Sequence, residues 1–224
     1  FRLDCAALCA DRDYMVAHRM ISLGMALLLA GCGGGERPET ATRGTIEADW
    51  HKTVTSTDMD RLRDWRTAFT KAIDKASASG NAESIAREGA LLQPDAALDS
   101  ATLLAGSYRC RVIKIGGKAA GARDYVVYPP SPCSVTREEE LLGFAKSGGT
   151  QRPVGLFFPA DNRKMIFLGT MVLGDERRPL EYGRDSTRDM AGALERVGVN
   201  RWRIILPYPR FESMLDVIEI VPAT

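Results

Sequence analysis

The fold is decided by the stretch Ser107-Tyr108-Arg109-Cys110-Arg111-Val112-Ile113-Lys114-Ile115, which Gly116-Gly117 follows directly. β-Branched and aromatic residues are typical of strands, and a glycine pair marks a turn. From about Gly106 the hydrophobic pattern of the chain changes its period. We therefore expect the first strand of an antiparallel all-β domain here, with that domain covering residues 106–224.

Eight further strand-like runs follow, and clusters of Gly, Pro, Asn and Asp separate them. Nine short strands without long helices between them predict an antiparallel meander, either a small closed barrel or a sandwich. Closure into a barrel would remove the exposed edges that promote aggregation. The eight runs are Asp124–Tyr128, Cys133–Thr136, Leu141–Lys146, Val154–Phe158, Lys164–Leu173, Met190–Val197, Arg201–Leu206 and Leu215–Val221.

A helical segment is expected upstream, over residues 46–105. A helix start at Ser56 has a capping oxygen and acids in its first turn, and Ser79-Gly80-Asn81 ends the helix. A shorter helix is expected over Ala82–Leu92. We interpret the apolar stripe of the first helix as core packing, with a binding surface as the alternative, so the fold class is α+β. The stripe consists of Leu62, Trp65, Phe69, Ala72, Ile73 and Ala76.

The N-terminal part of the chain predicts export. Ile21–Ala30 is an apolar run of ten residues, too short to span a bilayer, which needs about 20. His18 and Arg19 precede it and small residues follow, as in a secretory signal peptide. The alternative is a buried apolar helix. We assign residues 1–31 to the signal peptide and an upstream artefact of the gene model, with Met15 as the expected start.

The end of the apolar run, Leu29-Ala30-Gly31-Cys32, resembles the lipobox of bacterial lipoproteins. That resemblance implies cleavage before Cys32 and a lipid on its thiol, so that the membrane is a partner of the chain through this anchor. Several acyl chains together anchor a protein firmly. Residues 32–45 would form a flexible tether. Because Gly33 rather than Asp follows the cysteine, the resemblance favours the outer membrane, with the domain facing the periplasm.

Export would place Cys110 and Cys133 in an oxidising compartment, where paired cysteines usually form a disulfide. A metal or redox pair is the alternative. The sequence has no CxxC spacing, and no other cysteine or histidine lies near either residue. We therefore predict a structural disulfide.

Composition excludes several classes of function. The 224 residues carry a formal net charge of +1, so there is no basic excess to bind nucleic acid. Downstream of the apolar run the only histidine is His51, near the tether, which is a poor position for a Ser-His-Asp or Cys-His arrangement. Zinc sites built on several histidines are impossible. We expect no metal site and no cofactor.

Carboxylates are the remaining candidates for catalysis. Asp216 and Glu219 stand three apart on a predicted strand, so they should face opposite sides. Glu212 could converge with either of them, which would suit a carboxylate-dependent hydrolase. The pair Asp175-Glu176 lies in a turn beside two arginines, and we interpret it as a solvated charge cluster.

Two segments are candidates for binding. Thr150, Gln151 and Arg152 join two predicted strands with side chains capable of directional hydrogen bonds, although a structural turn would also explain them. Pro207 and Pro209 impose an extended stretch that should expose Tyr208 or Phe211. A barrel mouth of this kind is where a ligand or partner would bind.

Three stretches of the chain, Gly106–Gly116, Gly149–Pro159 and Glu195–Pro222, resemble a bacterial family catalogued as domain of unknown function 4893. The resemblance covers roughly the whole chain behind the signal peptide and implies no established activity. Our leading hypothesis is a non-enzymatic envelope protein whose β domain binds an envelope protein or a small apolar ligand. Alternatives are the hydrolase above and a periplasmic protease inhibitor, because small β-barrel inhibitors have a similar early Tyr-x-Cys strand.

Replacing Cys32 tests the predicted anchor. Cys32→Ser removes the thiol that would carry the lipid, so we expect loss of palmitate incorporation and release of the protein into the soluble fraction. Metabolic labelling with palmitate and cell fractionation measure both effects beside the wild type. If the variant stays in the membrane, the apolar segment itself is retained and the lipoprotein assignment is wrong.

Overall fold

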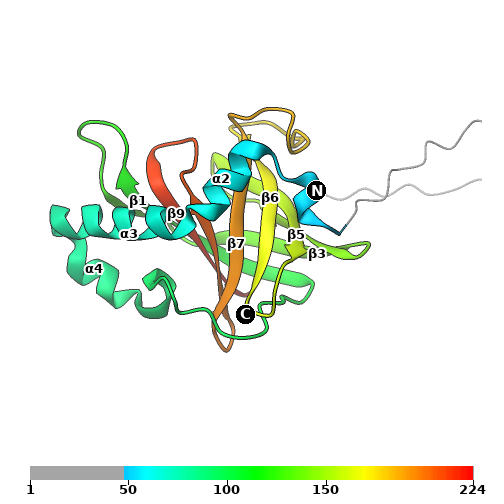
Figure 1. Cartoon of the computed structure of the whole chain (residues 1–224), viewed down its shortest axis with the longest axis horizontal. Coiled ribbons are helices and arrows are strands. Elements are labelled where there is room, and N and C mark those ends of the chain that lie inside the picture. Colours follow the sequence, from blue (N-terminus) through cyan, green and yellow to red (C-terminus); the bar gives the residue numbers. More distant parts are fainter. Residues whose placement is uncertain (1–47, 224) are drawn as a thin grey trace, which may run out of the picture. The chain divides into compact units, whose positions relative to one another are not determined.

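The computed structural model describes residues 48–223, and every strand predicted from the sequence is present at its expected place (Figure 1). The predicted signal peptide, lipidated Cys32 and tether lie outside the described residues. The strands are β1 (Gly106–Gly117), β2 (Tyr125–Val127), β3 (Ser131–Glu138), β4 (Leu141–Lys146), β5 (Gln151–Pro159), β6 (Lys164–Leu173), β7 (Asp189–Gly198), β8 (Arg201–Pro207) and β9 (Ser213–Pro222).

Pairing between β1 and β9 closes eight of these strands into an antiparallel barrel. The ladder runs from Tyr108 opposite Pro222 to Gly117 opposite Ser213. The structure thus decides between the two architectures that the sequence allowed, in favour of the barrel. β2 stands outside the ring and pairs only with the second half of β1.

The barrel interior is filled by side chains from alternate positions of its strands. Phe144, Phe157 and Phe167 form a triangle of rings with centroids 5.5–5.9 Å apart. Tyr108 and Trp202 meet edge to face at 6.3 Å. Trp202 therefore points into the core, as its alternation with Arg201 and Arg203 predicted. The interior of the barrel is therefore a packed hydrophobic core that stabilises the fold.

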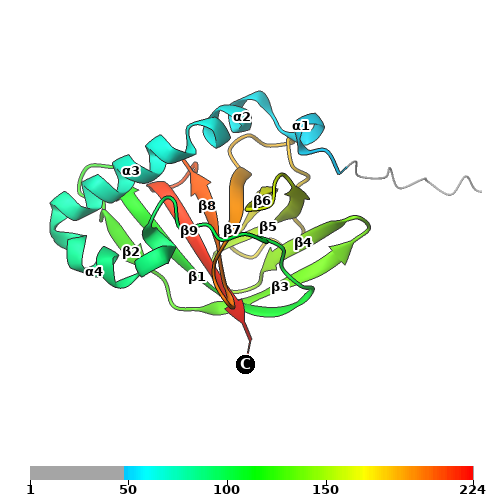
Figure 2. The same ribbon diagram turned by 60° about the horizontal axis from the view of Figure 1, so that its bottom comes forward.

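Helices cover part of the outer surface of the barrel (Figure 2). They are α1 (Trp50–Thr53), α2 (Ser56–Arg63), α3 (Trp65–Ala76) and α4 (Ala82–Arg87), with a π-helical turn η1 (Ser77–Asn81) and a 3₁₀ turn η2 (Gly89–Leu92). Gly80, at φ +85°, turns the chain between α3 and α4. Within residues 48–223, no helix combines the length and the apolar character needed to cross a membrane.

The helix expected from Ser56 to Ser79 is in fact two helices, which is a correction to the sequence prediction. Asp64 leaves helical geometry, at φ −91° and ψ 13°, and the nearby Thr67 and Tyr208 side chains lower the pKa of its carboxyl. The break lets the helices follow the curved barrel wall. Leu62 of α2 then packs in one cluster over β6 and β7, whereas Phe69 of α3 packs in another over β1, β8 and β9.

Arg203 fastens the helical segment to the barrel. Its side chain is fully buried, and its guanidinium contacts the Glu195 carboxylate at 2.7 and 3.0 Å. It also donates hydrogen bonds to four backbone carbonyls of the segment that follows α4, those of Ala90, Leu91, Gln93 and Pro94. A buried guanidinium needs this many acceptors, because an unpaired buried charge is costly.

The predicted disulfide is confirmed. Cys110 of β1 and Cys133 of β3 are joined, with their Cα atoms 5.9 Å apart. Both side chains are buried in the barrel core. The bond lies where the β1–β3 ladder ends, because Cys110 opposite Ser131 is the last pair of that ladder.

Removing this disulfide should lower the free energy of unfolding. The two cysteines are 23 residues apart, and the loop-entropy relation puts the loss for the double variant Cys110→Ala/Cys133→Ala at about 3.5 kcal/mol. Urea unfolding followed by circular dichroism measures the difference. The wild type unfolded with a reductant present should match the variant, and an unchanged midpoint in both would contradict a stabilising role.

Candidate functional site

β1 changes its neighbour halfway along, and this opens the barrel wall. Up to Cys110 it pairs with β3, and from Ile113 onward the same edge pairs with β2. The linker from Tyr128 to Ser131 crosses the gap. A cleft of about 520 Å³ lies there, within the size range of small-molecule sites. This mouth cleft is lined by Val112, Lys114, Tyr128, Pro129, Pro130, Ser131, Lys146, Gly149, Thr150, Gln151 and Glu212.

Lys114 projects into the barrel from β1 and is 6% exposed. Its Nζ lies 2.9 Å from Asp216 Oδ2 and 3.5 Å from Glu212 Oε2. Burial alone would lower the pKa of Lys114, but the two carboxylates outweigh that effect and raise it. The ammonium therefore stays charged at neutral pH.

Asp216 is the buried partner of this ion pair and is 3% exposed. Burial raises the pKa of its carboxyl, against the opposing effect of Lys114. Ser213 Oγ donates a hydrogen bond to the other carboxylate oxygen. The interaction is thus an enclosed ion pair with a hydrogen-bonded second oxygen, which is the arrangement that makes a buried charge tolerable.

Lys146 ends β4 on another wall of the mouth cleft and is 8% exposed. Its ammonium donates to the carbonyl of Gly148 in its own turn. No carboxylate of residues 48–223 lies within ion-pair distance of it. Burial lowers the pKa of Lys146, and the nearby charge of Arg152 lowers it further. This is a buried cation that lacks a counter-charge in the described part of the chain.

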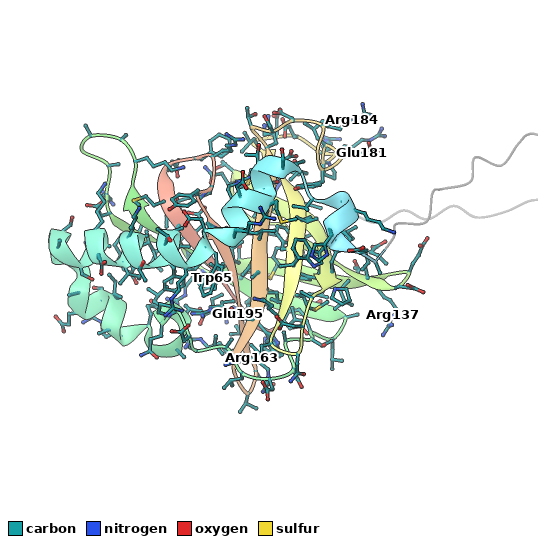
Figure 3. All side chains as sticks on the ribbon, in the orientation of Figure 1. Trp65, Arg137, Arg163, Glu181, Arg184 and Glu195 are labelled. Carbon is teal, nitrogen blue, oxygen red and sulfur yellow. A yellow bond between two sulfur atoms is a disulfide. The ribbon has the colours of Figure 1, made fainter. Side chains whose placement is uncertain are left out.

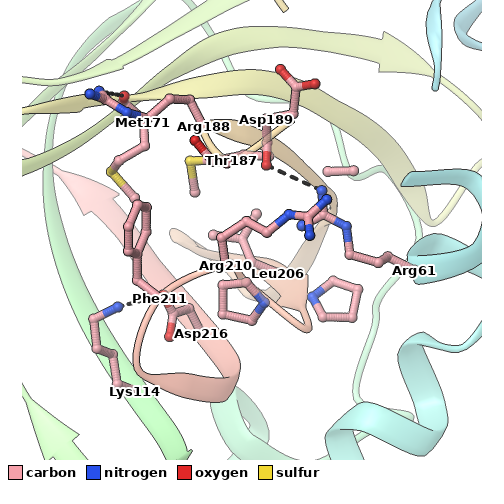
Figure 4. Close-up of a pocket in the computed structure, with 14 residues that line it drawn as sticks. Arg61, Lys114, Met171, Thr187, Arg188, Asp189, Leu206, Arg210, Phe211 and Asp216 are labelled. Carbon is pink, nitrogen blue, oxygen red and sulfur yellow. Dashed lines mark hydrogen bonds and ion pairs between the residues drawn. The ribbon is translucent and has the colours of Figure 1, made fainter. Parts of the chain in front are cut away.

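The mouth cleft ends at a narrow crevice that holds about 10 Å³, space for roughly one water. Figure 4 shows the ring of Phe211 between Met171 and Lys114. Phe211 packs against the core cluster of the barrel. This stretch was expected to expose Tyr208 or Phe211. Both side chains are partly buried, Phe211 against the barrel core, and their role in binding stays a prediction.

A polar network ties α2 to the long loop between β6 and β7. The hydroxyl of Tyr182 donates to Asp58 Oδ2 at 2.5 Å, and burial raises the pKa of Tyr182. Arg61 donates to Asp58 and to the carbonyl of Asp189 at 3.2 Å. Sequence reasoning missed this network, because Asp58 and Tyr182 are 124 positions apart and no local pattern links them.

The candidate residues of the strand-joining segment divide into two groups. Thr150 and Gln151 line the mouth cleft. Arg152 joins its own turn to the one that follows β6, since its guanidinium donates to the carbonyls of Gly149, Gly174 and Glu176 at 2.6–3.1 Å. Arg152 therefore has a structural role, and binding by Thr150 and Gln151 stays a prediction.

The candidate carboxylates also separate. Asp216 faces the interior, whereas Glu219 lies outside, 2.7 Å from Arg111 and 2.6 Å from Arg201. The two therefore face opposite sides, as predicted. Glu212 converges with Asp216, but Lys114 binds both of them. Among residues 48–223, no group of three or more His, Cys, Asp or Glu side chains could hold a metal ion.

Lys114 and Lys146 were not singled out from the sequence, although a signal for them exists. Each occupies an interior position of its strand, two residues after Val112 and Phe144 respectively. A lysine in the core-facing register of a strand breaks the binary pattern, and such breaks concentrate at functional sites.

Comparison with known proteins gives one match. The model of a family described as domain of unknown function (DUF4893) matches residues 50–220, which include the helical segment and almost all of the barrel. No curated protein and no solved structure matches the chain.

Lys114→Met tests the buried ion pair. The substitution leaves Asp216 buried without its ion-pair partner, so we expect a loss of about 3–5 kcal/mol in the free energy of unfolding at neutral pH. Because burial raises the pKa of Asp216, its carboxyl becomes neutral on acidification and then needs no cation. The loss should therefore shrink as the pH falls, which denaturant titrations across pH can measure.

The double variant Lys114→Met/Asp216→Leu is the matched control, since it removes both charges and should recover most of the lost stability. If the single and double variants are equally unstable at every pH, the loss comes from packing and not from an unpaired charge.

Proposed function

This chain belongs to the family described as domain of unknown function (DUF4893), and from that premise we propose that it is a non-enzymatic binding module for a small anionic ligand. The ligand would occupy the mouth cleft, with its anionic group between the ammonium groups of Lys146 and Lys114. The observation that carries this proposal is the burial of Lys146 beside the cleft with no carboxylate partner among the described residues.

The energetic argument starts from the cost of burying a charge. An ammonium taken out of water loses several kcal/mol of hydration, and a nearby anion offsets that loss. Asp216 does so for Lys114, 2.9 Å away. Lys146 has only a carbonyl acceptor, and its lowered pKa reflects the unfavourable charge. A carboxylate or phosphate in the cleft would supply the missing counter-charge through charge-assisted hydrogen bonds.

The rest of the lining limits the size and polarity of the ligand. Thr150, Gln151 and Ser131 offer neutral hydrogen-bonding groups, while Val112 and Pro130 give the cleft a short apolar wall. The interior beyond the cleft is packed and plugged, so a long acyl chain has no cavity to enter. A compact organic acid or phosphate ester fits these constraints better than the purely apolar ligand expected from the sequence.

Glu212 would act as an internal stand-in for the ligand. Its carboxylate is 3.5 Å from Lys114 Nζ, yet its side chain is 56% exposed and can move into solvent. Its backbone has φ +60°, an unfavourable conformation for a residue with a side chain. Strained positions of this kind cluster at ligand sites. An entering anion would displace Glu212 from Lys114 and leave the Asp216 pair in place.

We place this module in the bacterial envelope, held by a lipid on Cys32. Support comes from the lipobox resemblance and from the disulfide, because disulfides persist in oxidising compartments. A protease inhibitor shares the small-barrel architecture, but it would act through an N-terminal arm that this anchor hinders. A carboxylate hydrolase has weaker support, since Lys114 pairs with both candidate acids.

Lys146→Ala should weaken anion binding by roughly ten- to hundredfold, the effect of one charge-assisted hydrogen bond of about 1.5–3 kcal/mol. Lys146→Arg should retain most of it, and Glu212→Gln should strengthen it by removing the internal competitor. NMR titration with inorganic phosphate, acetate and succinate at low salt measures the affinities. Lys71→Ala, at an exposed lysine of α3, is the matched control.

The proposal would be abandoned if none of these anions shifts the amide signals of Thr150 and Gln151. Equal binding by the wild type and Lys146→Ala would be just as damaging, because it would show that the anions bind elsewhere on the surface.

A further inference from the structure

A groove separate from the mouth cleft runs along the outer wall of the barrel, beside the helical segment. It consists of two adjoining clefts of about 350 and 340 Å³, which share Trp65, Asp161, Lys164 and Glu195. We call it the tryptophan groove. Figure 3 labels Trp65, Glu195 and Arg163, which lie along its course.

Aromatic side chains line this groove near the point where Asp64 separates α2 from α3. Trp65 opens α3 directly after the break at Asp64 and is only partly buried, with its ring perpendicular to that of Phe69. It lines both clefts. Trp50 lines one of them, and its ring stacks on His51 with centroids 3.7 Å apart. Two indoles thus present apolar surface in a region where the core does not enclose them.

The charged groups along the groove balance one another. Lys164 lies 3.6 Å from Asp161, and Glu195 is held by Arg203. Asp95 receives a hydrogen bond of 2.7 Å from Arg66. The groove therefore has no net charge that would select an ion, in contrast to the mouth cleft. Its rims nevertheless carry carboxylate oxygens and the amide of Asn162, which can hydrogen-bond to hydroxyl groups.

We propose that the tryptophan groove binds a neutral carbohydrate chain. A hexose ring has an apolar C–H face that can pack on an indole, while its hydroxyls need the hydrogen-bonding groups that the rims supply. Two clefts meeting at Trp65 fit consecutive rings of an oligosaccharide. A nucleic acid is disfavoured by the carboxylates. An extended peptide is disfavoured because β6 and β7, which form the floor, are paired on both sides and offer no free strand edge.

The indole N–H signals in an NMR titration test this proposal directly, because the chain contains three tryptophans. Trp50 and Trp65 lie at the groove, whereas Trp202 is inside the barrel and serves as an internal reference. We expect an N-acetylglucosamine tetramer or a cellulose-derived tetrasaccharide to shift the first two signals and leave the third in place. No shift of Trp50 and Trp65 at millimolar sugar would overturn the proposal.

Trp65→Ala should weaken sugar binding at least tenfold, and Trp65→Phe, which keeps a flat ring, should weaken it less. An unshifted Trp202 signal shows that each variant is folded. Should Trp65→Ala fail to fold, Asp161→Ala on the exposed rim replaces it, with a several-fold loss expected. Unchanged affinity in whichever of these variants folds would refute the assignment. Lys146→Ala should bind the sugars like the wild type, which separates this site from the mouth cleft.

Discussion

The hydrogen bonds between β1 and β9 are the constraint on which the rest of the structure depends. A sheet of short strands has edges of unpaired backbone groups, and this ladder closes the eight-stranded ring by joining the first long strand to the last. Closure forces alternate residues of every strand inward, which produces the packed aromatic interior. It also makes the outer wall continuous across β8, β9 and β1. α3 can therefore bury Phe69 and Ala72 over three strands at once, and Arg203 can fasten the following turn to the same wall.

The same strand accounts for the opening of the barrel. β1 is longer than the ladder it shares with β3, so its second half continues beside β2 and leaves a gap in the ring. Two interior positions beside this gap are lysines, Lys114 and Lys146, which are buried and line the mouth cleft. A wholly closed ring would have required apolar residues there. The mouth cleft is thus a consequence of strand length and register, with its charge supplied by residues that would not be tolerated deeper in the barrel.

Sequence reasoning recovered much of the fold and less of the candidate site. The strands were predictable because Gly- and Pro-rich turns separate runs of β-branched residues, and the disulfide because two cysteines remain in the body of the chain. Barrel and sandwich were not separable, since β1–β9 pairing links residues such as Tyr108 and Pro222 that no local pattern connects. The break at Asp64 and the burial of Phe211 were missed for the same reason: each depends on a curved surface that exists only after folding. Thr150 and Gln151 were found from their chemistry, whereas Lys114 and Lys146 needed the register of their strands.

Closure by the two ends of the β domain also sets an order of events during folding. The hairpin-like unit of β1, β3 and β4 can form as soon as it is made, and its disulfide can lock then, because Cys110 and Cys133 are only 23 residues apart. The final ladder must wait for β9, the last strand within residues 48–223, and pairing across so large a sequence separation is slow. Until that moment β1 and β8 are open edges, and Phe69 has no complete surface to cover. Before closure, the folding chain is therefore most prone to aggregation. Its exposed apolar surface and unpaired strand edges are then what a chaperone would bind.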